Sequence, residues 1–320
     1  MDSPKKQTTV NTKLISLRIY TSCLETVLGW YYRETRGSRS LDSFSNMAKS
    51  NDWMFPIGAS IRSFLREKKP VPDDQDCIPY NFACGEGIWK TLEHKTEWKK
   101  AFDDNIKARL QAYTVPWHLK FPYAEKLAHK LSTEMRKSIT IVDVGGHLGV
   151  DLTRFLAHNP DFPGSLVLQD LPKTLEKVGT LDSRVQVMPY DFFTPQPVRG
   201  MYVLAESCSS LQLDSAADIY YFKSVLHDWD DQSSIKLLSQ TASTMSRESR
   251  LLINEMVLPN VGASLDGAAM DLMMYFLSAG IERTLAQWTH LLASVQPKLR
   301  IVEVWSADND AQAVIETILA

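Results

Sequence analysis

The chain has 320 residues, of which 44% are hydrophobic and 23% are charged. Two domains of ordinary size fit into this length, and the composition excludes disordered, collagen-like and coiled-coil architectures. The net charge is −3, with an excess of Lys and Arg in residues 1–130 and of Asp and Glu in residues 131–320. Because no basic run exceeds two residues, we expect these opposite charges to help the halves dock or dimerise, not to bind nucleic acid.

The sequence predicts neither a membrane segment nor a metal site. Uncharged stretches fall short of the ~18 apolar residues that a membrane span needs, and the segment MDSPKKQTTVNTK lacks a signal-peptide apolar run. The histidines form no HExxH or HxH motif. The cysteines are irregularly spaced and form neither a disulfide framework nor a CxxC motif. They are Cys23, Cys77, Cys84 and Cys208. We therefore expect a cytoplasmic protein.

Two patterns meet near residue 135. Before it, apolar residues recur at helical spacing in Leu14–Tyr32 and Trp98–Tyr113, on either side of a turn-rich stretch, Lys69–Asp74. From Ser138, strands and helices alternate. The predicted strands are Ser138–Val144, Ser165–Gln169, Val185–Met188, Asp218–Phe222, Arg250–Glu255, and a terminal pair, Leu299–Val304 and Ala313–Leu319. The predicted helices are Val150–Leu156, Gln232–Met245, Asp266–Ser278 and Leu285–Ser294. This alternation predicts a doubly wound, mostly parallel sheet, which binds ligands at the carboxyl ends of its strands.

A glycine-rich turn follows the first predicted strand. Glycines at this place let the backbone turn sharply and approach a ligand closely. The order here is D-x-G-G-x-x-G, not the G-x-G-x-x-G of a dinucleotide site, and no phosphate-binding Lys-Ser or Lys-Thr follows. This pattern favours a nucleoside without a pyrophosphate. The residues expected to form this part of the site are Asp143, Gly145, Gly146 and Gly149.

The next two strands end in residues that suit the remainder of a nucleoside. Asp170 closes the second strand, where an acidic residue accepts hydrogen bonds from ribose hydroxyls. After the third strand, Asp191 offers a carboxylate to an exocyclic amine, and Phe192 offers an aromatic face to a purine. A strand-end turn with core phenylalanines explains this last segment equally well.

A histidine follows the fourth strand. His227 stands at the ligand-binding edge, Glu255 ends the fifth strand at the same edge, and Glu282 lies in a loop that returns towards it. Two carboxylates beside an imidazole select its tautomer and raise its basicity, which suits a general base. A lone histidine is more often structural, so the two glutamates carry this prediction.

Together these motifs resemble a known family. Val142–Gly149, Asp170-Leu171-Pro172, Leu226–Trp229 and Gly280–Thr284 are similar to segments of the caffeate-type O-methyltransferases of plants and fungi, which use S-adenosylmethionine and no metal. The resemblance implies a Rossmann-like methyltransferase domain over residues 131–320. It also implies a mainly helical, shortened winged-helix-like dimerisation domain over residues 1–130, and hence a homodimer.

The resemblance also implies roles for individual residues. Gly145 contacts the methionine part of the cofactor, and the Asp170-Leu171 segment lies at its ribose. Asp191 and Phe192 bracket its adenine. Lys223 and Asp228 lie along the cofactor. His227 is the base, flanked by Glu255 and Glu282.

A phenolic or polyketide-like metabolite is the acceptor that this resemblance implies. A phenol with a pKa near ~10 is mostly protonated at neutral pH, so a base must take its proton before the oxygen attacks the methyl group. Segment Ala268–Phe276, with Trp89, Trp117 and Tyr123, is expected to line an apolar acceptor pocket. Methionines at helical spacing also occur in ordinary cores.

Three features depart from the family pattern. His147 replaces a glycine of the turn, and the N-terminal domain is shorter than in related chains. Met201–Ala216 is an additional segment, which we interpret as a surface loop or as translated intron sequence. We consider two alternatives to methyl transfer. One is a cyclase or pericyclase that keeps S-adenosylmethionine only for its positive charge, which the presence of His227, Glu255 and Glu282 disfavours. The other is an inactive paralogue, which the short N-terminal domain and the additional segment suggest.

Overall fold

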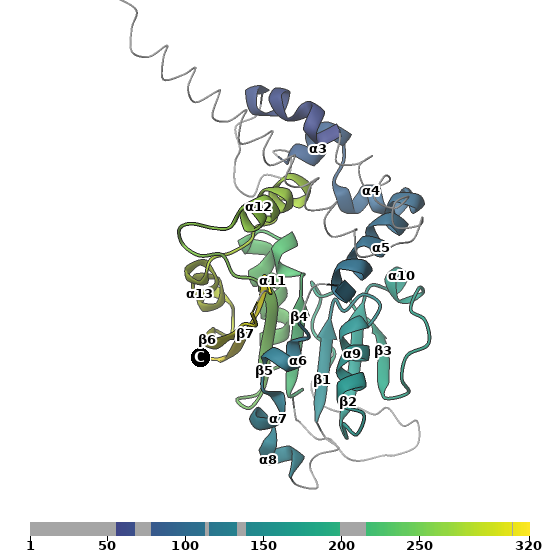
Figure 1. Cartoon of the computed structure of the whole chain (residues 1–320), viewed down its shortest axis with the longest axis vertical. Coiled ribbons are helices and arrows are strands. Elements are labelled where there is room, and N and C mark those ends of the chain that lie inside the picture. Colours follow the sequence, from purple (N-terminus) through teal and green to yellow (C-terminus); the bar gives the residue numbers. More distant parts are fainter. Residues whose placement is uncertain (1–55, 68–77, 113–114, 133–138, 199–215, 309) are drawn as a thin grey trace, which may run out of the picture. The chain divides into compact units, whose positions relative to one another are not determined.

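The computed structural model describes residues 56–67, 78–112, 115–132, 139–198, 216–308 and 310–320 (Figure 1). The predicted helix Leu14–Tyr32 lies outside these residues, as does the additional segment Met201–Ala216 except for Ala216. The chain divides into two compact units. One contains the described residues up to Ile106 together with Gly262–Ala279, and the other contains Lys107–Val261 together with Gly280–Ala320.

The first unit contains helices and no strand among its described residues. Residues 56–67 are helical, and α3 (Pro79–Cys84), α4 (Ile88–His94) and the start of α5 (Thr96–Ala112) follow. Phe64 packs edge-on against Phe82, with ring centroids 5.6 Å apart. The distant segment α12 (Leu265–Ser278) lies against α3, so the predicted helix Asp266–Ser278 joins this unit. The assignment of residues 1–130 to a winged-helix-like dimerisation domain stays a prediction.

The second unit is built on a seven-stranded sheet (Figure 1). The strand order is β3-β2-β1-β4-β5-β7-β6, and the first five of these strands run parallel. The strands are β1 (Thr140–Val144), β2 (Ser165–Asp170), β3 (Val185–Pro189), β4 (Ile219–Lys223), β5 (Arg250–Met256), β6 (Leu299–Trp305) and β7 (Gln312–Leu319). The predicted Rossmann-like, mostly parallel sheet is confirmed, and each predicted strand is present within two residues of its expected bounds.

Side chains alternate between two cores along the central strands. Ile219 and Tyr221 of β4 face one core, whereas Tyr220 and Phe222 face the other. Helices that cover the first face include α6 (Trp117–Lys120), α9 (Val150–His158) and α10 (Pro172–Leu175), and α7 (Tyr123–Lys126) and α8 (Ala128–Leu131) follow α6. Helices α11 (Asp231–Ala242) and α13 (Leu285–Ser294) cover the second face. Because helices cover both faces of the sheet, we expect a ligand-binding site at the carboxyl ends of the parallel strands.

Helices α6–α8 extend the second unit beyond its predicted start at residue 131. Trp117 is fully buried and stacks on Phe155 of α9, with centroids 5.4 Å apart. Tyr123 packs edge-on against Phe155 and donates its hydroxyl to Asn159. The expectation that Trp117 and Tyr123 line an acceptor pocket is therefore wrong, because both rings attach α6 and α7 to the core beneath α9.

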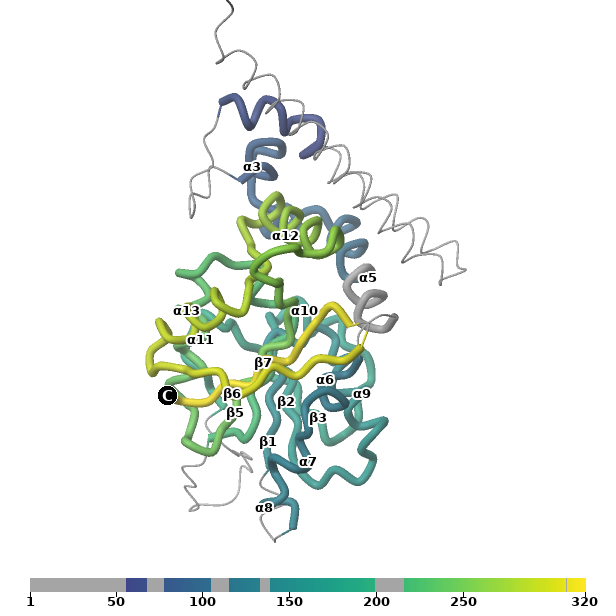
Figure 2. The backbone as a smooth tube through the Cα atoms, turned by 60° about the vertical axis from the view of Figure 1, so that its left-hand side comes forward, coloured from purple at the N-terminus to yellow at the C-terminus, as the bar shows by residue number. Residues whose placement is uncertain are grey.

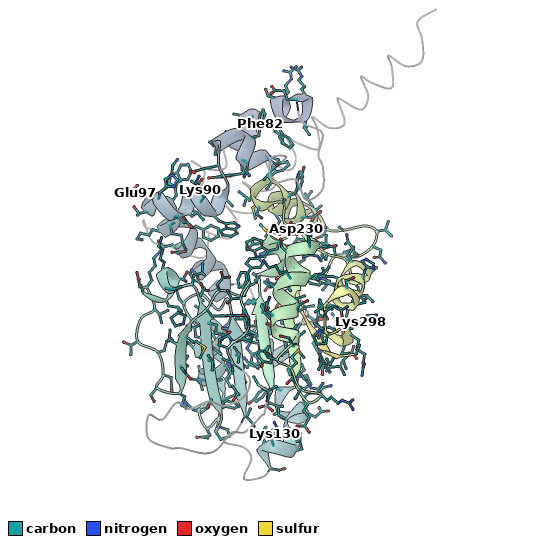
Figure 3. All side chains as sticks on the ribbon, turned by 180° about the vertical axis from the view of Figure 1, so that it is seen from behind. Phe82, Lys90, Glu97, Lys130, Asp230 and Lys298 are labelled. Atoms are coloured by element: carbon teal, nitrogen blue, oxygen red, sulfur yellow. The ribbon has the colours of Figure 1, made fainter. Side chains whose placement is uncertain are left out.

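The C-terminal strands form an antiparallel hairpin at the edge of the sheet, drawn in yellow in Figure 2. They were predicted as a pair, and the structure confirms their pairing. Asp230, labelled in Figure 3, begins α11 as an N-cap, since its carboxylate accepts a hydrogen bond from Ser233 N. No helix within the described ranges is long and apolar enough to cross a membrane.

Candidate active site at the carboxyl edge of the sheet

The turn after β1 requires its glycines. Gly145 has a φ of 72°, and a Cβ there would lie 2.9 Å from Val225 Cγ2. At Gly146 a Cβ would lie 2.5 Å from Asp143 Cγ and 2.5 Å from Leu168 Cδ1. Real Cβ atoms do not approach other atoms so closely, so this turn is packed directly onto β2 and onto the segment after β4. Gly149 begins α9 as its N-cap.

His147 has a left-handed backbone conformation, which glycine adopts more readily than other residues. Its φ is 53°, in the left-handed region that costs an L-residue about 1 kcal/mol or more. Its backbone N–H donates to Asp170 Oδ2 over 2.9 Å. The hydrogen bond to Asp170 helps to hold His147 in this conformation, and the cost is met by the rest of the fold.

Asp170 connects the glycine turn to the next loop. While its Oδ2 accepts from His147, its Oδ1 accepts from Leu171 N over 2.8 Å. Each carboxylate oxygen has a further lone pair, so the half-buried Asp170 can also accept from a diol. The Leu171 side chain is 51% exposed beside it, an apolar surface next to these acceptors.

An aromatic cluster follows β3 at the same edge. Phe192, Phe193 and Trp229 meet edge to face, with Phe193 and Trp229 4.8 Å apart and Phe192 and Trp229 6.1 Å apart. Asp191 is exposed, and its Oδ1 accepts from Phe193 N over 2.9 Å. The alternative that these are core phenylalanines is correct in part. Phe192 and Phe193 pack against the core that contains Tyr220 and Phe222, but both remain half exposed.

Beneath the turn lies a buried polar network. Lys223 Nζ is 3.0 Å from Asp151 Oδ2, which also accepts from the Tyr221 hydroxyl over 3.0 Å. Asp143 is 2% exposed and its Oδ2 has no hydrogen-bond partner among the described residues. Burial and the charge of Asp151 raise the pKa of Asp143 well above its usual value. Asp143 thus supports the turn from below.

The predicted histidine and glutamates do come together. His227 Nδ1 lies 2.7 Å from Glu282 Oε1 and 3.8 Å from Glu255 Oε2, and its Nε2 lies 3.8 Å from Asp228 Oδ1. Because an ionised carboxylate only accepts, the Glu282 contact assigns the Nδ1 proton to a hydrogen bond. Nε2 is then the ring atom that can exchange a proton with a ligand.

These carboxylates decide the charge of the imidazole. Burial by itself lowers the pKa of His227, but the charges of Glu255, Glu282 and Asp228 outweigh burial and raise this pKa to about 10. Burial raises the pKa of Glu255 to about 7, against the opposing charge of His227. At neutral pH the His227 ring is therefore mainly an imidazolium ion.

The geometry of these three residues differs from that of a metal chelate. Their ligand atoms lie within 4.8 Å of one another. However, Nδ1 and Oε1 are 2.7 Å apart, whereas ligands at about 2.0–2.1 Å from a tetrahedral zinc lie about 3.3 Å from each other. The spacing fits a hydrogen-bonded pair.

Sequence reasoning missed two residues that organise this site. Asp151 pairs with Lys223, and Arg283 is completely buried behind the His227 turn. Arg283 belongs to the Gly280–Thr284 motif, but the motif by itself predicted no role for it. A charged residue directly after Glu282 was the available signal, since a buried arginine needs several acceptors.

A model of the O-methyltransferase domain matches residues 64–295. The chain belongs to this family. The O-methyltransferase ATR12 of Stachybotrys chlorohalonatus is 34% identical over 259 residues, which are 80% of this chain and 60% of ATR12. The demethylsterigmatocystin 6-O-methyltransferase stcP of Emericella nidulans is 34% identical over 209 residues, which are 65% of this chain and 91% of stcP.

Solved structures share the fold of this chain. One described as a pericyclic reaction enzyme has a TM-score of 0.73 and 19% identity, with 100% of this chain and 90% of that chain covered. At this identity the likeness concerns the fold alone. Our chain, which belongs to the O-methyltransferase domain family, spans about 60% of the length of ATR12.

Proposed function

We propose that the protein transfers a methyl group from S-adenosylmethionine to a hydroxyl of a phenolic or polyketide-like secondary metabolite, with His227 as the general base. Family membership and the fungal O-methyltransferase relatives support the class of reaction. The observation that carries the role of His227 is the 2.7 Å contact between Nδ1 and Glu282, which leaves Nε2 for the acceptor proton.

The residues of the sheet edge fit the proposed cofactor. The glycine turn has no room for a Cβ at Gly146, and Asp170 retains acceptor capacity for ribose hydroxyls. Asp191 and Phe192 offer a carboxylate and an aromatic face for adenine, and Asp228 and Lys223 lie further along the same edge. When bound, S-adenosylmethionine supplies an electrophilic methyl group on a positively charged sulfur.

His227 then handles the proton of the acceptor. A phenol has a pKa near ~10 by analogy with Tyr, close to the pKa of about 10 for His227, so proton transfer between them is nearly balanced in free energy. The cost is that only about one ring in a thousand is neutral at pH 7. The rate should therefore increase about tenfold per pH unit from pH 7, and level off near pH 10.

A cyclase is the second candidate function. The observation that favours it is the predominance of imidazolium at neutral pH, because a charged ring donates a hydrogen bond to a substrate instead of taking its proton. The solved pericyclic reaction enzyme shows that this fold serves such chemistry. A cyclase leaves the substrate mass unchanged, consumes no S-adenosylmethionine, and does not require an alkaline optimum.

The first experiment incubates the purified chain with S-adenosylmethionine and a panel of phenols between pH 6 and pH 10. Demethylsterigmatocystin belongs in the panel because it is named as the substrate of the relative stcP. Mass spectrometry should show a product heavier by one methylene unit, with S-adenosylhomocysteine formed in equal amount. A product of unchanged mass supports the cyclase, and a flat pH profile of methyl transfer contradicts the role of His227.

Cofactor binding has its own test. Gly146→Ala should weaken S-adenosylmethionine binding in calorimetry by more than tenfold, because the added Cβ collides with Asp143 and Leu168. Gly179→Ala is the matched control, since a Cβ there has nothing within 4 Å. Equal binding by both variants in folded protein would contradict the proposed cofactor site.

We also propose that the protein is a homodimer, with residues 1–130 as its dimerisation domain and residues 131–320 as its methyltransferase domain. The helical character of the described part of residues 56–112 supports this proposal. Light scattering coupled to size-exclusion chromatography should give twice the chain mass of 36.2 kDa. A mass of one chain at micromolar concentration contradicts it.

A further inference from the structure

The turn that carries His227 is held weakly by its own hydrogen bonds. It is a single 3₁₀ turn over Leu226–Asp228. Its two backbone bonds, from Asp228 N to Val225 O and from Trp229 N to Leu226 O, are both 3.3 Å long, beyond the usual value of about 2.9–3.0 Å. A turn this short does not hold an imidazole in one place by itself. The surrounding residues must supply the constraint.

Glu255 holds the turn by accepting hydrogen bonds from two backbone amides at its start. Its Oε1 accepts from Val225 N and from Leu226 N, each over 2.9 Å. Its other oxygen lies 3.8 Å from His227 Nδ1, which is too far for a hydrogen bond. Glu255 is completely buried, so the two amide bonds are the short contacts of this carboxylate with the turn. Its contact with the imidazole is electrostatic only.

Arg283 holds the same turn by donating hydrogen bonds to two of the backbone carbonyls of the turn. Its guanidinium donates to Leu226 O over 2.9 Å and to Trp229 O over 2.8 Å, the two ends of the segment that contains His227. It also donates to Asp231 Oδ1 over 2.9 Å and lies over the Trp288 ring. A planar fork reaches two carbonyls at once, whereas a lysine ammonium does not have this geometry.

The segment before Arg283 makes a third contact. Ile281 N donates to His227 O over 2.9 Å. This approach needs Gly280, because a Cβ there would lie 2.0 Å from the same carbonyl oxygen. Residues 280–283 therefore press directly on the backbone of His227 while Glu282, in the same segment, bonds to its ring.

We propose that Arg283 and Glu255 are positioning residues that clamp the backbone of the His227 turn. Arg283 binds the carbonyls of the turn and Glu255 binds its amides, while Glu282 orients the imidazole ring. Under this proposal the two glutamates beside His227 have different tasks. Glu282 acts on the imidazole itself, and Glu255 acts mainly on the chain that carries it. The kinetic readout below rests on the proposed methyl transfer, but the exchange readout does not.

Hydrogen exchange tests the clamp without any substrate. In Arg283→Lys, which keeps the positive charge and loses the fork, the amides of residues 225–229 should exchange at least about tenfold faster than in the wild type. Glu255→Met should do the same because it removes the acceptor. Glu255→Gln should remain protected, since an amide oxygen can accept both bonds. Asp231→Asn is the control, because the contacts of Arg283 with both carbonyls remain.

Kinetics separate position from charge. The charged groups that face His227 are Glu255, Glu282 and Asp228, with Arg283 behind the turn. Arg283→Lys should lower kcat about tenfold or more, while the midpoint of the pH profile stays unchanged. Glu255→Gln should move that midpoint to lower pH with kcat at its plateau within about threefold of the wild type.

The outcomes are distinguishable. Wild-type exchange in Arg283→Lys overturns the clamp, as does equal loss of protection in Glu255→Gln and Glu255→Met. Each variant is compared at equal folded fraction, measured by thermal melting, so that general destabilisation is not mistaken for local opening. If no variant or wild-type protein transfers methyl groups, the proposed function fails while the exchange result still decides the clamp.

Discussion

Two histidines of the second unit are almost equally buried, but their pKa values are shifted in opposite directions. His227 is 8% exposed and His118 is 6% exposed. Carboxylates surround His227 and raise its pKa to about 10, whereas burial and the nearby His158 lower the pKa of His118 to about 4. Burial alone favours a neutral imidazole, and carboxylates within 4 Å reverse that preference.

His118 lies among core residues. Its Nε2 is 2.9 Å from His158 Nδ1, and Trp117 and Phe155 lie edge-on to its ring. It therefore serves as a core residue that fixes α6 against α9. The difference teaches that position at the carboxyl edge of the sheet, with acids from neighbouring segments, distinguishes a candidate base from a buried structural histidine.

The largest expected effect separates the two histidines by activity. His227→Ala should lower methyl transfer by about 10²–10⁴-fold, because that is the usual contribution of a general base. S-adenosylmethionine affinity, measured by calorimetry, should stay within about threefold of the wild type. His118→Phe, which keeps an aromatic ring in the core, should retain activity within about threefold. Similar activity in the two variants would break the comparison.

Removing one carboxylate should move His227 towards the behaviour of His118. Glu282→Gln keeps an acceptor for Nδ1 but loses the negative charge, so the pKa of His227 should fall by about one unit or more. The alkaline limb of the pH–rate profile then moves to lower pH, and kcat at its plateau should fall about threefold as the base weakens. An unchanged midpoint would show that Glu282 does not set the charge of His227.

The dependence of stability on pH should have opposite signs for the two residues. The pKa of His118 in the folded state lies below its ordinary value of 6.5, so its contribution is present above pH 6.5 and is lost as the pH falls towards 4. The pKa of His227 lies above 6.5, so its contribution is present below pH 6.5 and is lost as the pH rises through about 10.

Thermal melting across pH measures both signs. Between pH 6.5 and pH 4, His118→Phe should lose less stability than the wild type. Between pH 7 and pH 10, the difference in melting temperature between the wild type and His227→Gln should shrink. A parallel shift of all three curves at every pH would contradict the assigned charges.

The smallest effect extends the comparison to a buried acid. Asp143 is 2% exposed, and burial and the charge of Asp151 raise its pKa well above its usual value, which disfavours the charged form. Asp143→Asn should therefore change the free energy of unfolding by less than about 1 kcal/mol and leave S-adenosylmethionine affinity within about threefold. Asp151→Asn, which removes the charged partner of Lys223, should cost more, and equal effects would contradict the raised pKa of Asp143.

Local sequence pattern predicted the elements well where burial and periodicity agree. The strand at Arg250–Glu255 and the helix at Leu285–Ser294 are present as β5 and α13, because each is an apolar run with clear ends. Trp117 was misplaced because an apolar aromatic residue suits a pocket and a core equally well. Only contacts that are distant in the chain, such as its stacking on Phe155, distinguish the two.

The candidate site also combines features that the sequence predicts with features that only the structure reveals. Its residue types and their places at strand ends were readable from the sequence, since parallel strands bring their carboxyl ends to one edge. The convergence of His227 and Glu282, 55 positions apart, was inferred from that rule and is present at 2.7 Å. The separate tasks of Glu255 and Arg283 were not inferable, because hydrogen bonds to backbone amides and carbonyls leave no trace in residue spacing.

The sequence by itself determined the mostly parallel sheet, the glycine turn after its first strand and the acids and histidine at its edge, because these follow from period, composition and order along the chain. Tertiary structure decided the directions in which the pKa values of His227, Asp143 and His118 are shifted. Those properties depend on burial and on the distance to other charges, which arise only when segments far apart in the chain are packed together.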